Sequence, residues 1–264
     1  MGIVNVTPDS FSDGGRLADV EAAVAYGLTL TEQGADILDV GGESTRPGAE
    51  PVDADQEIAR AIPVIEGLRL AGWNGPVSID TMKPQVARAA VAAGATMWND
   101  VSALGHAPDG LETAASLGCD VVLMHMRGQP RTMQEAPDYT DVVPEVFEWL
   151  LARARVVMAA GVARERIWLD PGIGFGKTAD HNLALTAHLD RLTATGFPVL
   201  YGASRKRTIQ SIDPTATDAG DRLGGSLALA LEAARRGASI IRVHDVRETV
   251  QALKVQAAVA DAGP

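Results

Sequence analysis

The chain has 264 residues, of which 46% are hydrophobic and 22% are charged, and its formal net charge is −11. This composition is typical of a globular protein with a sizeable core, and the acidic balance, without a long Lys/Arg run, argues against nucleic-acid binding. No apolar run approaches the roughly 18 residues of a membrane span, and no signal-peptide pattern opens the chain. We therefore expect neither a membrane protein nor a secreted one.

Cys119 is the only cysteine and lies just before the apolar run Val121–Leu123. A single cysteine cannot form an internal disulfide, and buried thiols are common in the reducing cytosol. We expect a buried thiol in a cytoplasmic protein.

Short β-branched or aliphatic runs alternate with Ala-rich stretches of helical period along the whole chain. The predicted strands are residues 3–5, 35–40, 77–80, 96–99, 121–125, 167–170, 198–202 and 239–243. The predicted helices that follow them are at about residues 17–34, 53–71, 84–93, 110–117, 142–160, 181–195, 221–236 and 246–260.

This alternation predicts an α/β fold with a parallel sheet. Eight strand–helix pairs in one chain fit a closed (β/α)8 TIM barrel better than an open, doubly wound sheet. Neither a dinucleotide glycine fingerprint nor a P-loop follows the first strand, which also disfavours the open sheet. No linker-like stretch divides the pairs, so we expect residues 1–264 to form a single domain.

Every predicted strand ends in residues that can hydrogen-bond or carry charge. In chain order these are Asn5, Asp39 with Glu43, Asp80, Asn99, His125, Asp170, the trio Ser204–Lys206, and Arg242 with His244. Each alone has a structural explanation, such as a hydrogen-bonded barrel residue for Asp39 or a helix cap for Asn99. Together they predict an active site at the carboxyl-terminal ends of the strands, where barrel enzymes build theirs.

The charges at these ends are of both signs. Arg46, Lys206, Arg242 and His244 can hold an anion such as a phosphate, while Asp80 and Asp170, with Asp9 and Asp13 in the first loop, can accept hydrogen bonds. Adjacent N–H groups of the kind found on an aminopyrimidinone ring would match these carboxylates. Asn5 beside a phosphate is compatible with a loosely held Mg²⁺. No zinc-like spacing occurs.

Glycine-rich loops follow the second and sixth strands, at residues 41–48 and 170–177. Glycine allows the backbone to approach a ligand closely or to adopt a positive φ. Because these glycines stand among charged residues, we interpret both loops as parts of the site, whereas Gly14–Gly15 of the first loop are interpreted as turn residues.

Eight segments resemble dihydropteroate synthase, the folate-pathway enzyme that sulfonamides inhibit. They are MGIVNVTPDSFSDGG, DVGGESTRPGAEPV, VSIDTMKPQVARAA, WNDVSA, LMHMRGQPRTMQEAPDY, LDPGIGFGKTADHN, GASRKR and IRVHDVRETV. They occur in the family's order and extend from residue 1 to about residue 250.

The resemblance implies a transferase that joins 6-hydroxymethyl-7,8-dihydropterin diphosphate to p-aminobenzoate and releases pyrophosphate. It also implies a Mg²⁺ cofactor, small-molecule substrates and a homodimer. By motif position, the pterin pocket would contain Asp80, Asn99, Asp170 and Lys206, and the diphosphate would contact Asn5, Thr45, Arg46, Arg242 and His244, with Asn5 near the metal. The p-aminobenzoate site would contain Phe11, Pro47, Lys206 and Arg207.

The chemistry that follows is a dissociative substitution. Cations would stabilise the departing pyrophosphate, and carboxylates would favour a cationic pterin. The residues expected to act in this step are Asp13, Arg46, Asp80, Asp170 and Lys206. Closure of the first loop over the site would exclude water.

Two departures from the family pattern stand out. Many members carry serine where this chain has Arg207, so the backbone N–H of Arg207 is the better candidate to receive the aminobenzoate carboxylate. Many also carry residues before the first motif that help to close the barrel floor, whereas here the motif begins at Met1.

Three other functions stay open at this point. A pterin-binding methyltransferase would need the pterin-edge residues but not Arg46, Arg242 and His244. A paralogue could bind pterin without turnover. Lys206 could instead form a Schiff base, because the neighbouring Arg205 and Arg207 could lower its pKa.

Overall fold

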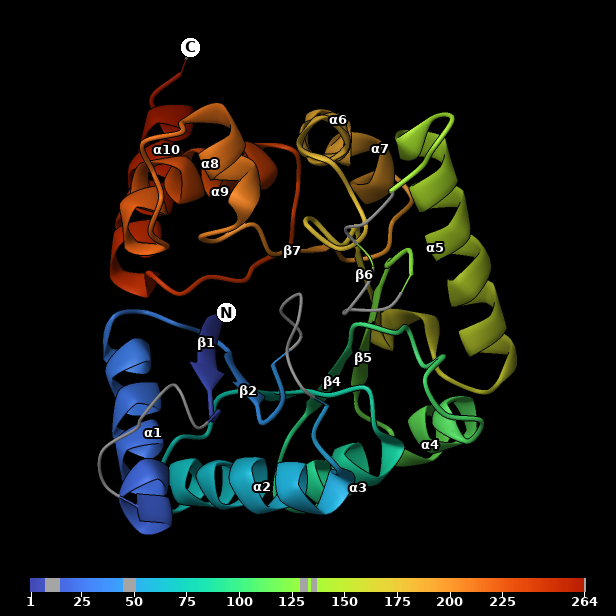
Figure 1. Cartoon of the computed structure of the whole chain (residues 1–264), viewed down its shortest axis with the longest axis vertical. Helices are drawn as coiled ribbons and strands as arrows, with labels where there is room; N and C mark the ends of the chain where they lie inside the picture. The colour runs from blue at the N-terminus through green and yellow to red at the C-terminus, as the bar shows by residue number, and fades with distance from the viewer. Residues whose placement is uncertain (8–14, 45–50, 129–132, 134–136, 264) are drawn as a thin grey trace.

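The computed structural model describes residues 1–7, 15–44, 51–128, 133 and 137–263. In this part of the chain, short strands form a ring at the centre of the molecule, and helices surround it (Figure 1). The strands are β1 (Gly2–Asn5), β2 (Leu38–Gly41), β3 (Val77–Asp80), β4 (Met97–Asp100), β5 (Asp120–Met124), β6 (Ile167–Asp170), β7 (Leu200–Tyr201) and β8 (Ile240–Ile241).

The helices follow the strands in the predicted alternation. They are α1 (Gly15–Glu32), α2 (Ala54–Leu70), α3 (Pro84–Ala92), α4 (Gly110–Leu117), α5 (Val142–Ala159), α6 (Ala179–Ala187), α7 (Leu189–Thr193), α8 (Arg207–Ile212), α9 (Leu223–Arg235) and α10 (Val246–Asp261). Two short 3₁₀ turns, η1 (Arg164–Arg166) and η2 (Gly220–Arg222), precede β6 and α9.

The strands pair in sequence order and close into a barrel. Strands β1 to β6 form one parallel sheet and β7 and β8 another. The backbone joins the two sheets on both sides, because Leu169 N donates to Pro198 O at 3.0 Å and Ile3 N donates to Val243 O at 3.1 Å. The parallel bridges Leu169–Val199 and Gly2–Val243 mark the same two seams. The (β/α)8 barrel expected from the sequence is therefore confirmed.

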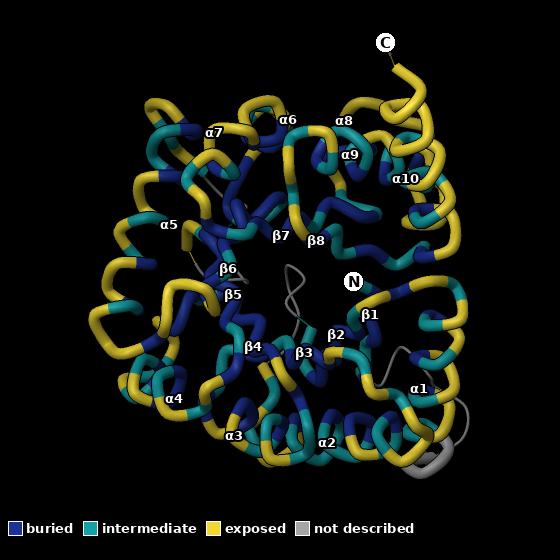
Figure 2. The backbone as a smooth tube through the Cα atoms, turned by 180° about the vertical axis from the view of Figure 1, so that it is seen from behind, coloured by how far each residue is buried: buried dark blue, intermediate teal, exposed yellow. Residues whose placement is uncertain are grey.

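Alternate residues of each strand face opposite sides of the barrel wall. One set, such as Val40, Ile79 and Leu169, packs with the helices in the main apolar core. The other set faces the inside of the barrel. Its apolar members form a small cluster of Met97, Val122, Leu200 and Ile240, and Met1, Ile37 and Trp168 pack against this cluster. The strands are accordingly buried and the outer faces of the helices exposed (Figure 2).

The inward-facing set changes character along β2, β4, β6 and β8. In these strands a polar residue follows an apolar residue of the inner cluster by two positions, as in Ile37 and Asp39 or Met97 and Asn99. Trp168 and Ile240 are followed in the same way by Asp170 and Arg242. Period-two alternation thus fills one end of the barrel with apolar side chains and directs the polar side chains to the carboxyl-terminal end.

Local signals account for most helix boundaries. Asp53 caps α2 by accepting from Gln56 N at 2.8 Å, Thr178 and His181 form a capping box at α6, and Pro84 begins α3. The single helix predicted at 181–195 is wrong, because it breaks into α6 and α7 at His188, where φ is −119°. Helix α8 is a short helix that the hydrophobic pattern did not predict.

Two expectations from composition can be compared with the structure. Cys119 is 7% exposed, as expected for a buried thiol, and burial raises its pKa to about 11. Within the described ranges, we find no helix with the length and apolar character that crossing a bilayer requires.

Candidate active site

The barrel brings the predicted strand-end residues to one end of the molecule. Asn5, Asp80 and Asp170 are the last residues of β1, β3 and β6, Asn99 is the third residue of β4, and Arg242 directly follows β8. Lys206 and Arg207 follow β7, and His244 follows β8. The predicted residues Phe11, Asp13, Thr45, Arg46 and Pro47 lie outside the described residues.

Arg242 joins two of the barrel carboxylates. Its Nε donates to Asp39 Oδ2 at 2.6 Å and its Nη2 donates to Asp80 Oδ2 at 2.8 Å. The two carboxylates stabilise the cation and raise the pKa of Arg242, although burial opposes this. Arg242 therefore stays charged, and among the described residues its Nη1 has no hydrogen-bond partner.

Asp39 was one of the predicted strand-end residues, but no substrate was assigned to it from the sequence. Its side chain is fully buried, and its Oδ2 also accepts from Asn99 Nδ2 at 3.3 Å. Asp39 thereby connects the arginine to the amide of β4. The available signal was its place two residues before the end of β2, on the inward face of the barrel.

Asp80 and Asp170 are the last residues of β3 and β6, and the pKa of each is raised. Burial raises the pKa of Asp80, and Arg242 opposes the rise. Burial also raises the pKa of Asp170, where Lys206 opposes it and Gly172 N donates to Oδ1 at 2.7 Å. Asp80 Oδ1 is buried with no hydrogen-bond partner in the described part of the chain, so it can accept from a ligand.

Lys206 follows β7, immediately before α8, and contacts the β6–α6 loop. Its Nζ donates to Ile173 O and sits 4.5 Å from the centroid of the Phe175 ring. Burial lowers the pKa of Lys206 to about 8, while Asp170 acts in the opposite direction. The loop glycines at 172, 174 and 176 all have positive φ, as interpreted from the sequence, at 68°, 81° and 62°.

The Ser204–Lys206 trio is fixed by contacts to β8 and α10. Ser204 Oγ lies 3.0 Å from His244 Nδ1 and accepts from His244 N at 3.2 Å. Arg205 has a left-handed φ of 60° and donates to Asp245 Oδ2 through Nε at 3.0 Å. This geometry sends Arg205 away from the barrel end, whereas Arg207 starts α8 with an exposed side chain.

Gly41 lies beside the side chains of Asn5 and Asp80. A Cβ on Gly41 would lie 3.6 Å from Asp80 Cβ and 3.9 Å from both Asn5 Oδ1 and Asp80 Oδ2. In the described part of the chain we find no cluster of three His, Cys, Asp or Glu side chains that could hold a metal alone. One amide oxygen fits only an ion that keeps most of its ligands from water and phosphate, as Mg²⁺ does.

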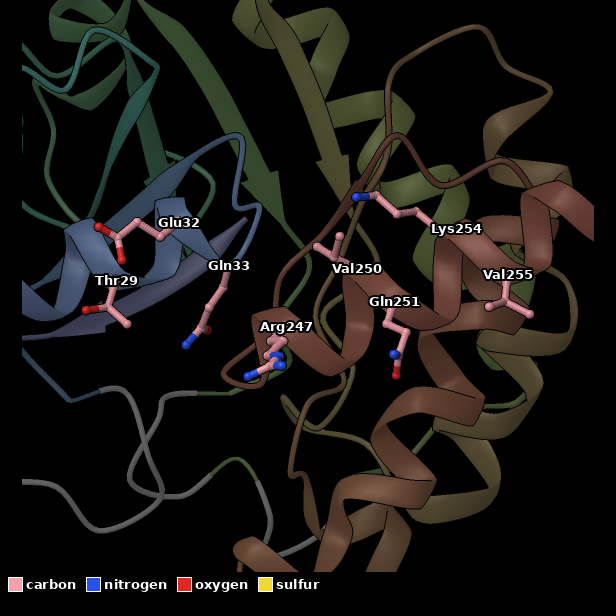
Figure 3. Close-up of a pocket in the computed structure, with 8 residues that line it drawn as sticks. All are labelled: Thr29, Glu32, Gln33, Arg247, Val250, Gln251, Lys254 and Val255. Carbon is pink, nitrogen blue, oxygen red and sulfur yellow. The ribbon is translucent and has the colours of Figure 1, made fainter.

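A groove elsewhere on the surface is not this site. It lies between α1 and α10, and Glu32, Arg247 and Lys254 are among the side chains that line it (Figure 3). None of the predicted site residues lines the groove, and it lies outside the barrel wall. The strand ends are therefore the better candidate for chemistry.

A family model described as pterin binding enzyme matches residues 1–244. The dihydropteroate synthase of Escherichia coli (strain K12) is 48% identical over 257 residues, which cover 97% of this chain and 89% of that protein. The chain belongs to the dihydropteroate synthase family.

Solved structures of family members agree with this assignment. The dihydropteroate synthase of Xanthomonas albilineans with 4-aminobenzoic acid is 54% identical, with a TM-score of 0.92 over 100% of this chain and 93% of that one. The same enzyme in complex with 7,8-dihydropteroate aligns with a TM-score of 0.89 and 51% identity, over 100% of this chain and 94% of that one. The resemblance drawn from eight short motifs is thus confirmed, and the methyltransferase alternative is not supported.

Proposed function

We propose that this chain condenses 6-hydroxymethyl-7,8-dihydropterin diphosphate with p-aminobenzoate to 7,8-dihydropteroate and releases pyrophosphate. The observation that carries the proposal is the pair of hydrogen bonds from Arg242 to Asp39 and Asp80. A strong cation and buried carboxylates in direct contact suit one substrate with an anionic end and a donor-rich end. The Xanthomonas albilineans enzyme has been solved with 4-aminobenzoic acid and with 7,8-dihydropteroate, the second substrate and the product of this reaction.

The pterin ring is assigned to the deep, carboxylate-lined side of the site. Asp80 and Asp170 accept hydrogen bonds from ring N–H groups, and the unpartnered Oδ1 of Asp80 supports this role. Asn99 offers an amide that can donate and accept, and Lys206 donates to a ring acceptor. Burial of these groups strengthens each hydrogen bond because water does not compete for it.

The diphosphate is assigned to Asn5, Arg242 and His244, with Thr45 and Arg46 as the members outside the described residues. The partner-free Nη1 of Arg242 supports this assignment, because a guanidinium can hold carboxylates and a phosphate oxygen at the same time. A cation at this position stabilises the charge that develops on the leaving pyrophosphate.

The p-aminobenzoate is assigned to the mouth of the site, beside Lys206 and Arg207. The backbone N–H of Arg207 at the start of α8 is the proposed donor to the carboxylate, since its side chain is exposed. Phe11 and Pro47 complete this part of the proposal, and Asp13 is proposed to act near the cation.

The proposed reaction is a dissociative substitution. The bond between the pterin methylene carbon and the diphosphate oxygen breaks, and its electron pair leaves with pyrophosphate. The aniline nitrogen lone pair then forms the new C–N bond, and the nitrogen releases one proton to solvent. Asp80 and Asp170 favour the intermediate cation. A secondary isotope effect near unity at the methylene would contradict this order.

Mg²⁺ belongs to the proposal as the family's cofactor, with Asn5 supplying an amide oxygen. When bound, the ion would neutralise charge on the diphosphate oxygens. The organisation of residues 1–264 as one domain, the assembly into a homodimer and a cytoplasmic location are proposed in the same way, on the family resemblance and the lone buried cysteine.

The test is pyrophosphate release from the dihydropterin diphosphate, with and without p-aminobenzoate and Mg²⁺. We expect continued, multiple-turnover release to require both and to match the dihydropteroate formed. A protein that binds pterin and releases nothing would be the non-catalytic paralogue. Covalent trapping of a carbonyl substrate by borohydride would instead support the Schiff-base role of Lys206.

A further inference from the structure

Lys177 is a buried lysine in the β6–α6 loop, and it is 3% exposed. Its Nζ donates to His125 O at 3.1 Å and to Phe175 O at 3.0 Å, and it lies 3.0 Å from His125 Nδ1. The amine nitrogen therefore has three hydrogen-bond partners. Among the described residues Lys177 forms no ion pair, and burial lowers its pKa to about 7, although Asp170 opposes this.

The histidine is neutral. Burial, with a contribution from the neighbouring Lys177, lowers the pKa of His125 to about 3. Its Nδ1 shares a hydrogen bond with Lys177 Nζ. His125 follows β5, and its backbone N–H donates to Asp170 O at 3.0 Å. The histidine is therefore attached to β6 through its backbone and to the next loop through its ring.

The loop packs directly on the backbone that follows β5. A Cβ on Gly172 would lie 1.9 Å from His125 O, and one on Gly176 would lie 2.2 Å from Arg127 O. Because the two backbone segments are this close, few side chains fit between them. Lys177 and the Tyr139 hydroxyl, which donates to Gly176 O at 3.0 Å, are the polar contacts that fasten the loop on this side.

The same loop packs against the side chain of Lys206. Ile173 O accepts from Lys206 Nζ, and the Phe175 ring lies under the same ammonium group. A Cβ on Gly174 would lie 3.0 Å from Lys206 Cδ, so the backbone follows the lysine stem closely. A shift of the Phe175 carbonyl would therefore move the groups that hold Lys206.

We propose that Lys177 is a positioning residue for Lys206, acting through the Phe175 carbonyl that it fastens to His125. This inference rests on the proposed function, because it concerns the lysine assigned to both substrates. Lys177 does not touch substrate in this proposal. It fixes the backbone of residues 173–175, and that backbone fixes the Lys206 ammonium.

The competing explanation is that Lys177 only stabilises the fold. Arg69 provides a matched control, because it also satisfies three backbone carbonyls, those of Trp73, Gly75 and Gly94, each at 2.7 Å. Those carbonyls lie in the loops that enter β3 and β4, at the opposite end of the barrel from Lys206. A purely structural loss should have the same consequences at both positions.

The experiment compares Lys177→Met and Arg69→Met with the unchanged chain in thermal unfolding, steady-state kinetics and calorimetric binding of 6-hydroxymethylpterin. We expect both variants to melt at a lower temperature. Only Lys177→Met should raise KM for p-aminobenzoate, weaken pterin binding and lower kcat/KM by about 100-fold, the size expected for a misplacement near 1 Å. Arg69→Met should leave both KM values unchanged.

Equal kinetic effects in the two variants, or unchanged kinetics in a folded Lys177→Met protein, would overturn the inference. If Lys177→Met does not fold, His125→Leu replaces it, because this variant removes the ring partner and keeps both carbonyls. It should shift KM in the same direction by a smaller factor, and unchanged KM values there would also reject the inference. Absence of turnover in the unchanged chain would reject the proposed function and not this inference.

Discussion

The side chains of Arg242 and Asp80 are hydrogen-bonded, with 2.8 Å between Nη2 and Oδ2, although 162 residues separate them in sequence. One is assigned to the diphosphate and the other to the pterin. The two halves of the proposed substrate therefore meet a single bonded group and not two independent pockets. Changing the arginine should consequently alter recognition of the pterin as well as of the diphosphate.

Replacing Arg242 by Gln should make pterin binding dependent on pH. Arg242 lowers the pKa of Asp80 against the effect of burial, so without it the pKa rises further. At neutral pH a larger fraction of Asp80 is then protonated and cannot accept from the ring, and the fraction falls again as pH increases. We expect 6-hydroxymethylpterin to bind the variant more weakly than the unchanged chain at pH 7, and the difference between the two proteins to shrink towards pH 9, measured by calorimetry of both.

Turnover of the Arg242→Gln variant should fall by about 100-fold or more at every pH, because the leaving group loses its cation. Arg236→Gln is the matched control, since Arg236 pairs with Asp190 and Glu232 outside the barrel. A difference in pterin affinity between the variant and the unchanged chain that stays the same from pH 7 to pH 9 would show that Arg242 does not control Asp80.

The stability of Arg242 variants should depend on Asp39. Asp39 is fully buried, so Arg242→Gln leaves a buried carboxylate without its cation, at a cost of about 3 kcal/mol. The double variant Arg242→Gln/Asp39→Asn removes that charge and should recover part of the loss while remaining inactive. Urea unfolding of the unchanged chain, Arg242→Gln, Asp39→Asn and the double variant measures this. Strictly additive losses of unfolding free energy would disprove the coupling.

The barrel could be predicted well because the short apolar strand runs and the helical period of the stretches between them are both clear in the sequence. Val77–Asp80 and Ile167–Asp170 have the predicted bounds, and both end in a polar residue on the inward face. No glycine or proline marks the break at His188, and the six residues of α8 are too few to show a helical period, although Pro214 follows the end of that helix. Tertiary contacts decide such short elements, not local preference.

The candidate site was predicted residue by residue but not as a network. That Asp39 would bond Arg242, 203 residues away, follows from closure of the ring between β8 and β1, which no local pattern encodes. The burial of Lys177 is hidden for a similar reason. A lysine after three loop glycines is typical of an exposed turn, and only the approach of that loop to His125 buries it.

The pH profile of kcat/KM should fall on the alkaline side with an apparent pKa near 8. Burial lowers the pKa of Lys206 to about 8, so above that pH the side chain loses its proton and its charge. The profile of kcat/KM reports groups of the free enzyme. In Lys206→Arg the alkaline decline should disappear below pH 10, even if the rate is lower, because arginine keeps its proton. A decline that persists in this variant would belong to another group, such as Lys177.

A buried charge cluster behind the second loop should control stability. Lys83 Nζ donates to Glu43 Oε2 at 2.5 Å and to Glu57 Oε2 at 2.6 Å, and the Glu57 side chain is fully buried. Glu43 Oε1 also accepts from Val52 N at 3.0 Å, so the cluster joins the two ends of the β2–α2 connection. Burial raises the pKa of Glu57, and the hydrogen bond from Lys83 opposes the rise.

Lys83→Met should therefore leave two carboxylates facing each other without a cation, and we expect a loss of about 3 kcal/mol in the free energy of unfolding. Arg235→Met is the control, because its ion pair with Glu232 is exposed on α9 and such pairs contribute only about 0.2–1 kcal/mol. Adding Glu57→Gln to Lys83→Met removes one of the unpaired charges and should restore part of the loss. Urea unfolding at pH 7 gives the free energy of unfolding of the unchanged chain, Lys83→Met, Lys83→Met/Glu57→Gln and Arg235→Met. Equal losses for Lys83→Met and Arg235→Met would mean that the cluster contributes no more than a surface ion pair.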